Sequence, residues 1–126
     1  MTGGIVFRAG EELAFLPATI AIKVMPLPEV ARVPGAPEAI LGVTLVDGGT
    51  MPVVCAAVPW SRPRSGAIPM LVLAFSGERI GLVGIDVLAT GHFEATAEGV
   101  MHDGNAARPF DVAALVARFA GGRWAV

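Results

Sequence analysis

The chain has 126 residues, of which 54% are hydrophobic and 16% charged, and its mean hydropathy is +0.67. This length and apolar content predict one folded domain with its own core and exclude a disordered chain. The longest apolar run, residues 67–75, is shorter than the ~18–20 residues that a membrane-spanning helix needs, and a net charge of −2 without a basic stripe disfavours nucleic-acid binding.

The N-terminal third predicts a β-hairpin followed by a less regular stretch. Residues 5–7 and 13–16 favour two strands joined by a turn at 9–11. A short helix is predicted to begin at Pro17, because Ile20 and Val24 are spaced i, i+4 and proline is accepted at the first helical position. The many β-branched residues of this stretch disfavour that helix. Pro26 ends the element, and residues 29–33 are expected to be extended.

The middle of the chain carries the strongest turn signals. Residues 34–37 predict a tight bend, and residues 40–46 predict a strand in which Gly42 indicates a bulge or the close approach of another backbone. Asp47-Gly48-Gly49 favours a hairpin turn that leads into a returning strand at 50–57. Because Pro52 has no N–H to donate, this returning strand is expected to lie at a sheet edge or to begin late.

The second half repeats the pattern of short strands between turns and closes with a helix. A Pro-, Arg- and Ser-rich loop, residues 59–66, separates the two halves. Strands are predicted at 70–75, 79–83, 85–94 and 100–102. Asp111 is a good N-cap for a C-terminal helix whose apolar stripe runs from Val112 to Phe119. Many short strands separated by Gly and Pro turns indicate an all-β barrel or sandwich.

Several of these segments, in this order and spacing, resemble a known family. The segments are Pro34-Gly35-Ala36-Pro37, Gly42-Val43, Gly48 and Pro52-Val53, followed by Gly81-Leu82-Val83 to Val87 and the helix at 110–119. Together they are similar to the chemotaxis coupling-protein (CheW-like) family, over roughly residues 6–119.

The resemblance implies a mainly β fold of two small five-stranded β-barrel-like halves around a shared core, with a C-terminal helix. We expect one domain over residues 1–126, with a central loop at about 58–68. The implied function is that of a non-catalytic adaptor, without a cofactor. It would join the regulatory domain of a CheA-type histidine kinase to the cytoplasmic tip of a chemoreceptor.

The expected location is the cytoplasm, at membrane-associated receptor arrays but without insertion into the membrane. The N-terminus has no signal-peptide pattern, and the single cysteine, Cys55, cannot form an internal disulfide. Both observations are typical of a protein that works in a reducing compartment.

The polar positions of the resembling segments differ from those of the family. Where the family turn has Asn-Leu-Arg-Gly, this chain has Leu45-Val46-Asp47-Gly48, so that Asp47 reverses the charge of the arginine. The family often carries a glutamate near Pro26, where this chain has no carboxylate, and such a glutamate and arginine could pair. Cys55 and Ile85 also replace family aspartates. These changes predict a conserved fold with altered partner contacts and no charge left without its partner.

The predicted partner-binding residues lie in two segments that would border an apolar groove between the halves. They are Ile22, Val24, Pro26, Leu45, Val46, Asp47 and Gly48. We expect the groove to take a helical hairpin tip and an edge strand to face the kinase. Trp60 and Trp124 are candidate anchors or core residues, and Arg62 and Arg64 are expected to be solvated.

Three other functions stay open as alternatives. The chain could be a small-molecule-binding β-barrel module or a divergent regulator of another two-component pathway. A cysteine enzyme would use Cys55 with His92 or His102, but the chain has no accompanying acid or oxyanion motif. The candidate metal ligands match no standard spacing, and the histidines are better interpreted as surface residues; these ligands are Asp86, His92, Glu94, His102 and Asp103.

Overall fold

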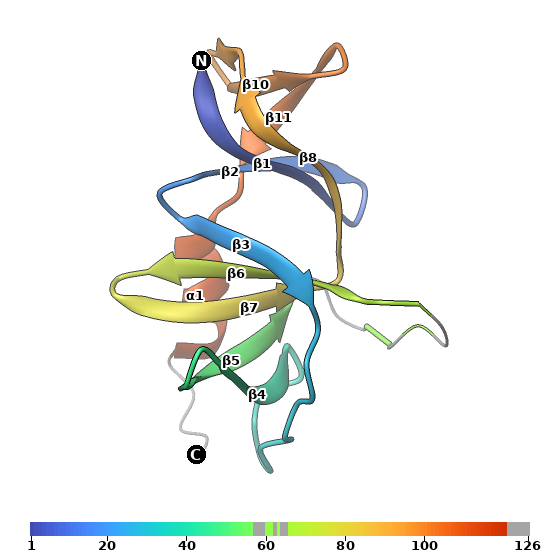
Figure 1. Ribbon diagram of the computed structural model, residues 1–126, viewed down its shortest axis with the longest axis vertical. Coiled ribbons are helices and arrows are strands. Elements are labelled where there is room, and N and C mark those ends of the chain that lie inside the picture. The colour runs from blue at the N-terminus through green and yellow to red at the C-terminus, as the bar shows by residue number, and fades with distance from the viewer. Residues whose placement is uncertain (57–59, 62, 64–65, 121–126) are drawn as a thin grey trace.

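The computed structural model describes residues 1–56, 60–61, 63 and 66–120, and within these it contains eleven strands and one helix (Figure 1). The elements are β1 (Thr2–Ala9), β2 (Glu12–Pro17), β3 (Ala21–Pro26), β4 (Ile40–Val46), β5 (Gly49–Cys55), β6 (Pro69–Phe75), β7 (Glu78–Val83), β8 (Ile85–Phe93), β9 (Ala95–Thr96), β10 (Gly99–His102), β11 (Asn105–Pro109) and α1 (Val112–Ala120). The mainly β fold with a C-terminal helix is confirmed.

The strands form two sheets that divide the chain unequally. The first sheet has six strands in the order β8-β1-β2-β11-β10-β9, the last of which is only two residues long. The second has the five strands β3-β6-β7-β5-β4. The second sheet uses one uninterrupted stretch of chain, whereas the first combines the N-terminal hairpin with strands that follow residue 84. One parallel pair occurs in each sheet, β2 with β11 and β5 with β7.

The second sheet closes into a barrel through a short backbone bridge. The Ala31 N–H donates to the Val43 carbonyl at 2.9 Å, and the Val43 N–H donates to the Ala31 carbonyl at 2.8 Å. Beside this bridge, the Thr44 hydroxyl donates to the Glu29 carbonyl at 2.7 Å. The segment that follows β3 therefore lies along the free edge of β4, at the opposite end of the sheet order.

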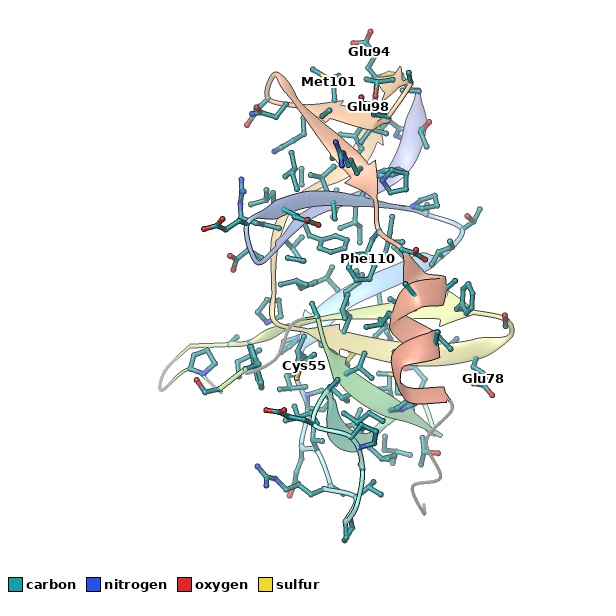
Figure 2. All side chains as sticks on the ribbon, turned by 180° about the vertical axis from the view of Figure 1, so that it is seen from behind. Cys55, Glu78, Glu94, Glu98, Met101 and Phe110 are labelled. Atoms are coloured by element: carbon teal, nitrogen blue, oxygen red, sulfur yellow. The ribbon has the colours of Figure 1, made fainter. Side chains whose placement is uncertain are left out.

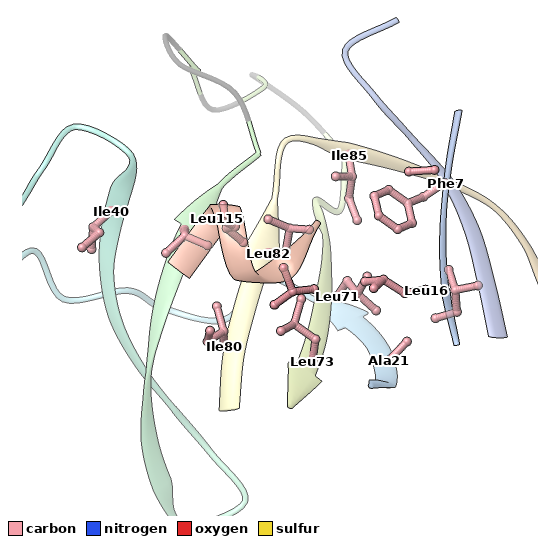
Figure 3. Packing of buried hydrophobic residues seen from close by; sticks show 14 residues of the cluster. Phe7, Leu16, Ala21, Ile40, Leu71, Leu73, Ile80, Leu82, Ile85 and Leu115 are labelled. Carbon is pink, nitrogen blue, oxygen red and sulfur yellow. The ribbon is translucent and has the colours of Figure 1, made fainter. Parts of the chain in front are cut away.

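A shared hydrophobic core joins the two sheets and the helix. Figure 2, which shows the molecule from behind, places α1 against the second sheet with Phe110 at its beginning. Figure 3 shows Leu115 of this helix close to Leu71 and Leu82, with Phe7 and Leu16 of the first sheet on the far side. A separate cluster, which includes Met51, Met70, Val72 and Val83, fills the interior of the second barrel. Burial of these side chains is the main source of stability.

Three hairpin turns have the geometry that their sequences predict. Asp47-Gly48, Ser76-Gly77 and Asp103-Gly104 each have positive φ at both residues, with values from 48° to 81°. Two successive residues with φ > 0 define the type I′ turn, whose twist matches that of the flanking strands. The turn predicted at residues 47–49 is therefore confirmed, together with the strands predicted at 40–46, 70–75, 79–83 and 100–102.

The helix predicted to begin at Pro17 is wrong. A turn closed by the bond from the Ile20 N–H to the Pro17 carbonyl leads directly into β3. The i, i+4 spacing of Ile20 and Val24 was misleading, since residues 21–26 pair with β6 in an antiparallel ladder. The β-branched Ile22 and Val24 fit this ladder, which a sequence pattern for a single segment does not reveal.

The prediction that Pro52 places its strand at an edge or makes it begin late is also wrong. β5 begins at Gly49 and lies between β4 and β7. Pro52 faces Val43, whose own backbone groups bond to Ala31 and so point away from β5. In such an antiparallel pair the two residues exchange no hydrogen bonds, and pairing with β7 starts only at Val53. The missing N–H therefore costs no ladder bond.

The C-terminal helix follows the prediction where the structure describes it. The Asp111 carboxylate accepts a hydrogen bond from the Ala114 N–H at 2.9 Å, which is the expected N-cap bond. Val112 and Leu115 face the shared core. The side chains of Arg118 and Phe119, together with residues 121–126, lie outside the described part of the chain. β9 and β11 were not predicted, because their sequences have little alternation of apolar and polar residues.

Candidate partner-binding surface

The predicted residues of β3 lie on the outside of the second barrel. Ile22 and Val24 are 42% and 38% exposed, and Pro26 is exposed as well. They alternate with Lys23 and Met25, which pair with Val72 and Met70 of the barrel interior. An exposed Ile and an exposed Val on one short strand form an apolar surface with no cover among the described residues.

The other predicted residues lie in and beside the turn between β4 and β5. Leu45 is 65% exposed, which makes its side chain the most exposed large apolar one after Met1 among the residues that the structure describes. Val46 is 8% exposed and packs inside the barrel, so its side chain is not offered to a partner. Asp47 and Gly48 form the turn itself.

An ion cluster joins these two segments. One carboxylate oxygen of Asp47, Oδ2, lies 2.8 Å from Lys23 Nζ and 3.4 Å from Arg79 Nη1. The three side chains come from β3, the β4–β5 turn and β7, and each is 38% to 57% exposed. Lys23 lies between Ile22 and Val24 in sequence but on the other face of β3, and Leu45 lies two residues before Asp47, so the Lys23–Asp47 contact links the two predicted segments.

The cluster fixes the charge state of Asp47. The hydrogen bond from Lys23, and then its positive charge, lower the pKa of Asp47 below its ordinary value of 3.8, and Arg79 adds to the effect. Because the folded-state pKa is lowered, the stabilisation by this pair is present above the ordinary pKa and is lost as the pH falls through the folded value. At neutral pH the cluster contains two cations and one anion.

Sequence reasoning missed Lys23 and Arg79. It expected the glutamate and arginine of the family to be absent and named no partner for Asp47, whereas Asp47 has two cationic partners. The two partners lie 24 and 32 residues away in sequence. One signal was available, because Lys23 is the only charged residue between Pro17 and Pro28 and interrupts an otherwise apolar strand. The location of Asp47 at the mouth of a barrel could not be read from that signal.

An open hollow of about 620 Å³ lies next to the cluster. It is formed by the β4–β5 and β6–β7 hairpins, and its walls include Asp47, Thr50, Met51 and Arg79. The hollow therefore combines a buried methionine at its base with charged side chains at its rim.

The other candidate residues are described only in part. Trp60 is half-buried and packs on the interior cluster of the second barrel, while Trp124, Arg62 and Arg64 lie outside the described residues. His102 Nε2 is 3.6 Å from Asp103 Oδ2. Within residues 1–56, 60–61, 63 and 66–120, no three His, Cys, Asp or Glu side chains come together as a metal site would require.

Cys55 is 3% exposed inside the second barrel, and burial raises the pKa of its thiol. We expect Cys55→Ala to reduce the free energy of unfolding by about 1 kcal/mol at neutral pH, through lost packing. The folded thiol holds its proton more tightly than the unfolded one, so the stability of the wild type should fall as the pH rises above about 9. The difference from Cys55→Ala in urea unfolding should then shrink. Rapid reaction of a thiol reagent with the folded protein would contradict this burial.

The fold and its surface define the class of protein. It is a two-barrel β domain with filled barrel interiors and with exposed apolar and charged residues on the outside of the second barrel. The chain belongs to the CheW-like domain family, because the model of that family matches residues 3–90. The matched range includes every predicted partner-binding residue.

A solved structure has the same fold. The crystal structure of the scaffolding protein TtCheW from Thermoanaerobacter tengcongensis is similar to this chain with a TM-score of 0.61 and 22% sequence identity. The similarity covers 83% of this chain and 86% of the other. A search of curated proteins found no match. Among the described residues, no helix has the length and apolar character needed to cross a membrane.

Proposed function

We propose that this protein is a non-catalytic adaptor that couples a CheA-type histidine kinase to chemoreceptors. Membership in the CheW-like family supports the proposal. The observation that carries it is the exposure of Ile22 and Val24 on β3 and of Leu45 on β4, two segments that the Lys23–Asp47 pair links. The adaptor would work in the cytoplasm, at arrays of membrane receptors.

The receptor tip is assigned to this surface for a physical reason. Two receptor helices that form a hairpin present apolar side chains at i, i+3 and i+4 spacing, which suits isolated apolar residues on a strand edge and a neighbouring turn. A stable contact of this kind buries ~800 Å² per partner, and its energy is concentrated in a few central apolar groups. The regulatory domain of the kinase would bind a different face, so that both partners are held at once.

Co-elution tests the proposal directly. The full chain would be mixed with the CheA-type kinase and with cytoplasmic receptor fragments from the same organism and analysed by size-exclusion chromatography. We expect complexes with each partner alone and a ternary complex with both. Failure to bind either partner at concentrations on the order of tens of micromolar would refute the adaptor function.

A matched pair of variants tests where the receptor binds. Leu45→Arg and Leu88→Arg each add a charge to an exposed leucine, the first on the second sheet and the other on β8 of the first sheet. We expect Leu45→Arg to weaken receptor binding at least about tenfold, because an unpaired charge would be buried at the centre of the contact. Leu88→Arg should change the affinity little. Equal losses for the two variants, measured by titration calorimetry, would move the receptor away from this surface.

A further inference from the structure

The ion cluster has more hydrogen-bond donors than its single carboxylate can use. The Lys23 ammonium has three N–H donors and the Arg79 guanidinium has five, while each makes one contact with the same Asp47 oxygen. Arg79 lies at 3.4 Å from that oxygen, which is long for a charge-assisted bond, and its side chain is 49% exposed. Both cations are therefore available to a further acceptor.

The backbone keeps this arrangement in place before any partner arrives. Asp47 has a φ of 51° in a type I′ turn, so its carboxylate starts from a fixed point between β3 and β7. Glu78, the residue before Arg79 in β7, also lines the hollow beside the cluster, but it forms no ion pair among the described residues, whereas Arg79 reaches Asp47. The cluster itself thus has a net charge of +1.

We propose that Lys23 and Arg79 bind an acidic side chain of the receptor partner, whose apolar neighbours contact Leu45. This inference rests on the adaptor function proposed above and specifies the chemistry of its receptor contact. Asp47 acts as a positioning residue that holds the two cations, rather than as a contact for a cation of the partner. An incoming carboxylate finds one N–H face of the guanidinium open and matches it in geometry.

A partner cation would be less favourable at the same place. Asp47 Oδ2 already accepts from both Lys23 and Arg79, and a third cation would approach two like charges at short range. An acidic partner is attracted at the same distance, which is shorter than the ~10 Å over which salt screens exposed charges at 0.1 M. The cluster therefore favours an acidic partner residue over a basic one.

Charge variants test the inference through receptor affinity. Lys23→Glu and Arg79→Glu should each weaken binding of the receptor fragment at least about tenfold, and the binding of the wild type should weaken as salt is raised. Asp47→Asn preserves the turn, since asparagine also accepts positive φ, and should weaken binding less than either charge reversal, because both cations remain. Arg8→Glu is the matched control, because Arg8 is an exposed arginine of the first sheet and, within the described part of the chain, its side chain bonds the Glu11 carbonyl alone.

The outcomes separate this inference from the adaptor function. If the wild type binds the receptor and Lys23→Glu and Arg79→Glu bind as well as Arg8→Glu, the acidic contact is refuted while the adaptor function stands. A loss with Asp47→Asn as large as that with Lys23→Glu would also overturn it, because Asp47 would then be the contact. Restoration of Lys23→Glu binding by an acid-to-lysine variant of the receptor would confirm the pairing. Thermal unfolding of each variant checks that the fold is intact.

Discussion

Alanine at Gly42 will destabilise the protein by about 3 kcal/mol, as measured by urea unfolding. Gly42 has a φ of 156° at the bulge of β4, and a Cβ there would overlap the Ala31 carbonyl and the Val30 side chain. The Ala31–Val43 bridge that closes the second barrel would have to move, and its two hydrogen bonds would be lost or lengthened. The expected loss of stability therefore combines backbone strain with a steric clash.

Gly91→Ala provides the matched control. Gly91 has a similar φ of 138° in β8, but a Cβ there would meet no atom within 4 Å. It should therefore show the cost of the backbone conformation alone, about 1–2 kcal/mol. If both alanine variants lost the same stability, the close approach of residues 30–31 would not contribute, and the barrel closure would be wrong.

Leu82→Ala will reduce the free energy of unfolding by about 3 kcal/mol, since the side chain is fully buried in the core shared by both sheets and the helix. The loss should appear in one transition, seen alike by far-ultraviolet circular dichroism and by tryptophan fluorescence. A shared core makes the two halves unfold together, as the predicted single domain over residues 1–126 requires.

The exposed Leu88→Ala is the control for Leu82→Ala, and it should change stability by less than about 1 kcal/mol. Two separate transitions in either variant would mean that the halves unfold independently. That result would contradict a single cooperative domain, although each half could still keep its own barrel.

The local features of the fold could be predicted because single residues determine them. Asp47-Gly48 predicts its turn from the ease with which these residues adopt positive φ. Gly42 was predicted to mark a bulge or a close backbone approach, and both occur. The N-cap at Asp111 followed from a short side chain before an apolar stripe. In each case the feature depends on residues that are close in sequence, or on a glycine that has no side chain.

The remaining features depend on strands that are distant in sequence. Residues 21–26 became a strand because β6 lies beside them, and Pro52 is accepted because of the direction in which Val43 bonds. The same limit applies to the candidate site. The exposure of Ile22, Val24 and Leu45 agrees with the predicted surface, but the partners of Asp47 come from two other strands. Their meeting is decided by barrel closure, which no local pattern encodes.

The unequal division of the chain between the sheets has a consequence for the order of folding. All strands of the second sheet lie between residues 21 and 83, so this half has its complete set of pairing partners while the ribosome still holds the rest of the chain. β1 and β2 emerge first, yet they need β8 and β11 and must wait for the last part of the protein. The N-terminal hairpin thus has unpaired edges during synthesis, and late contacts of large sequence separation complete the first half.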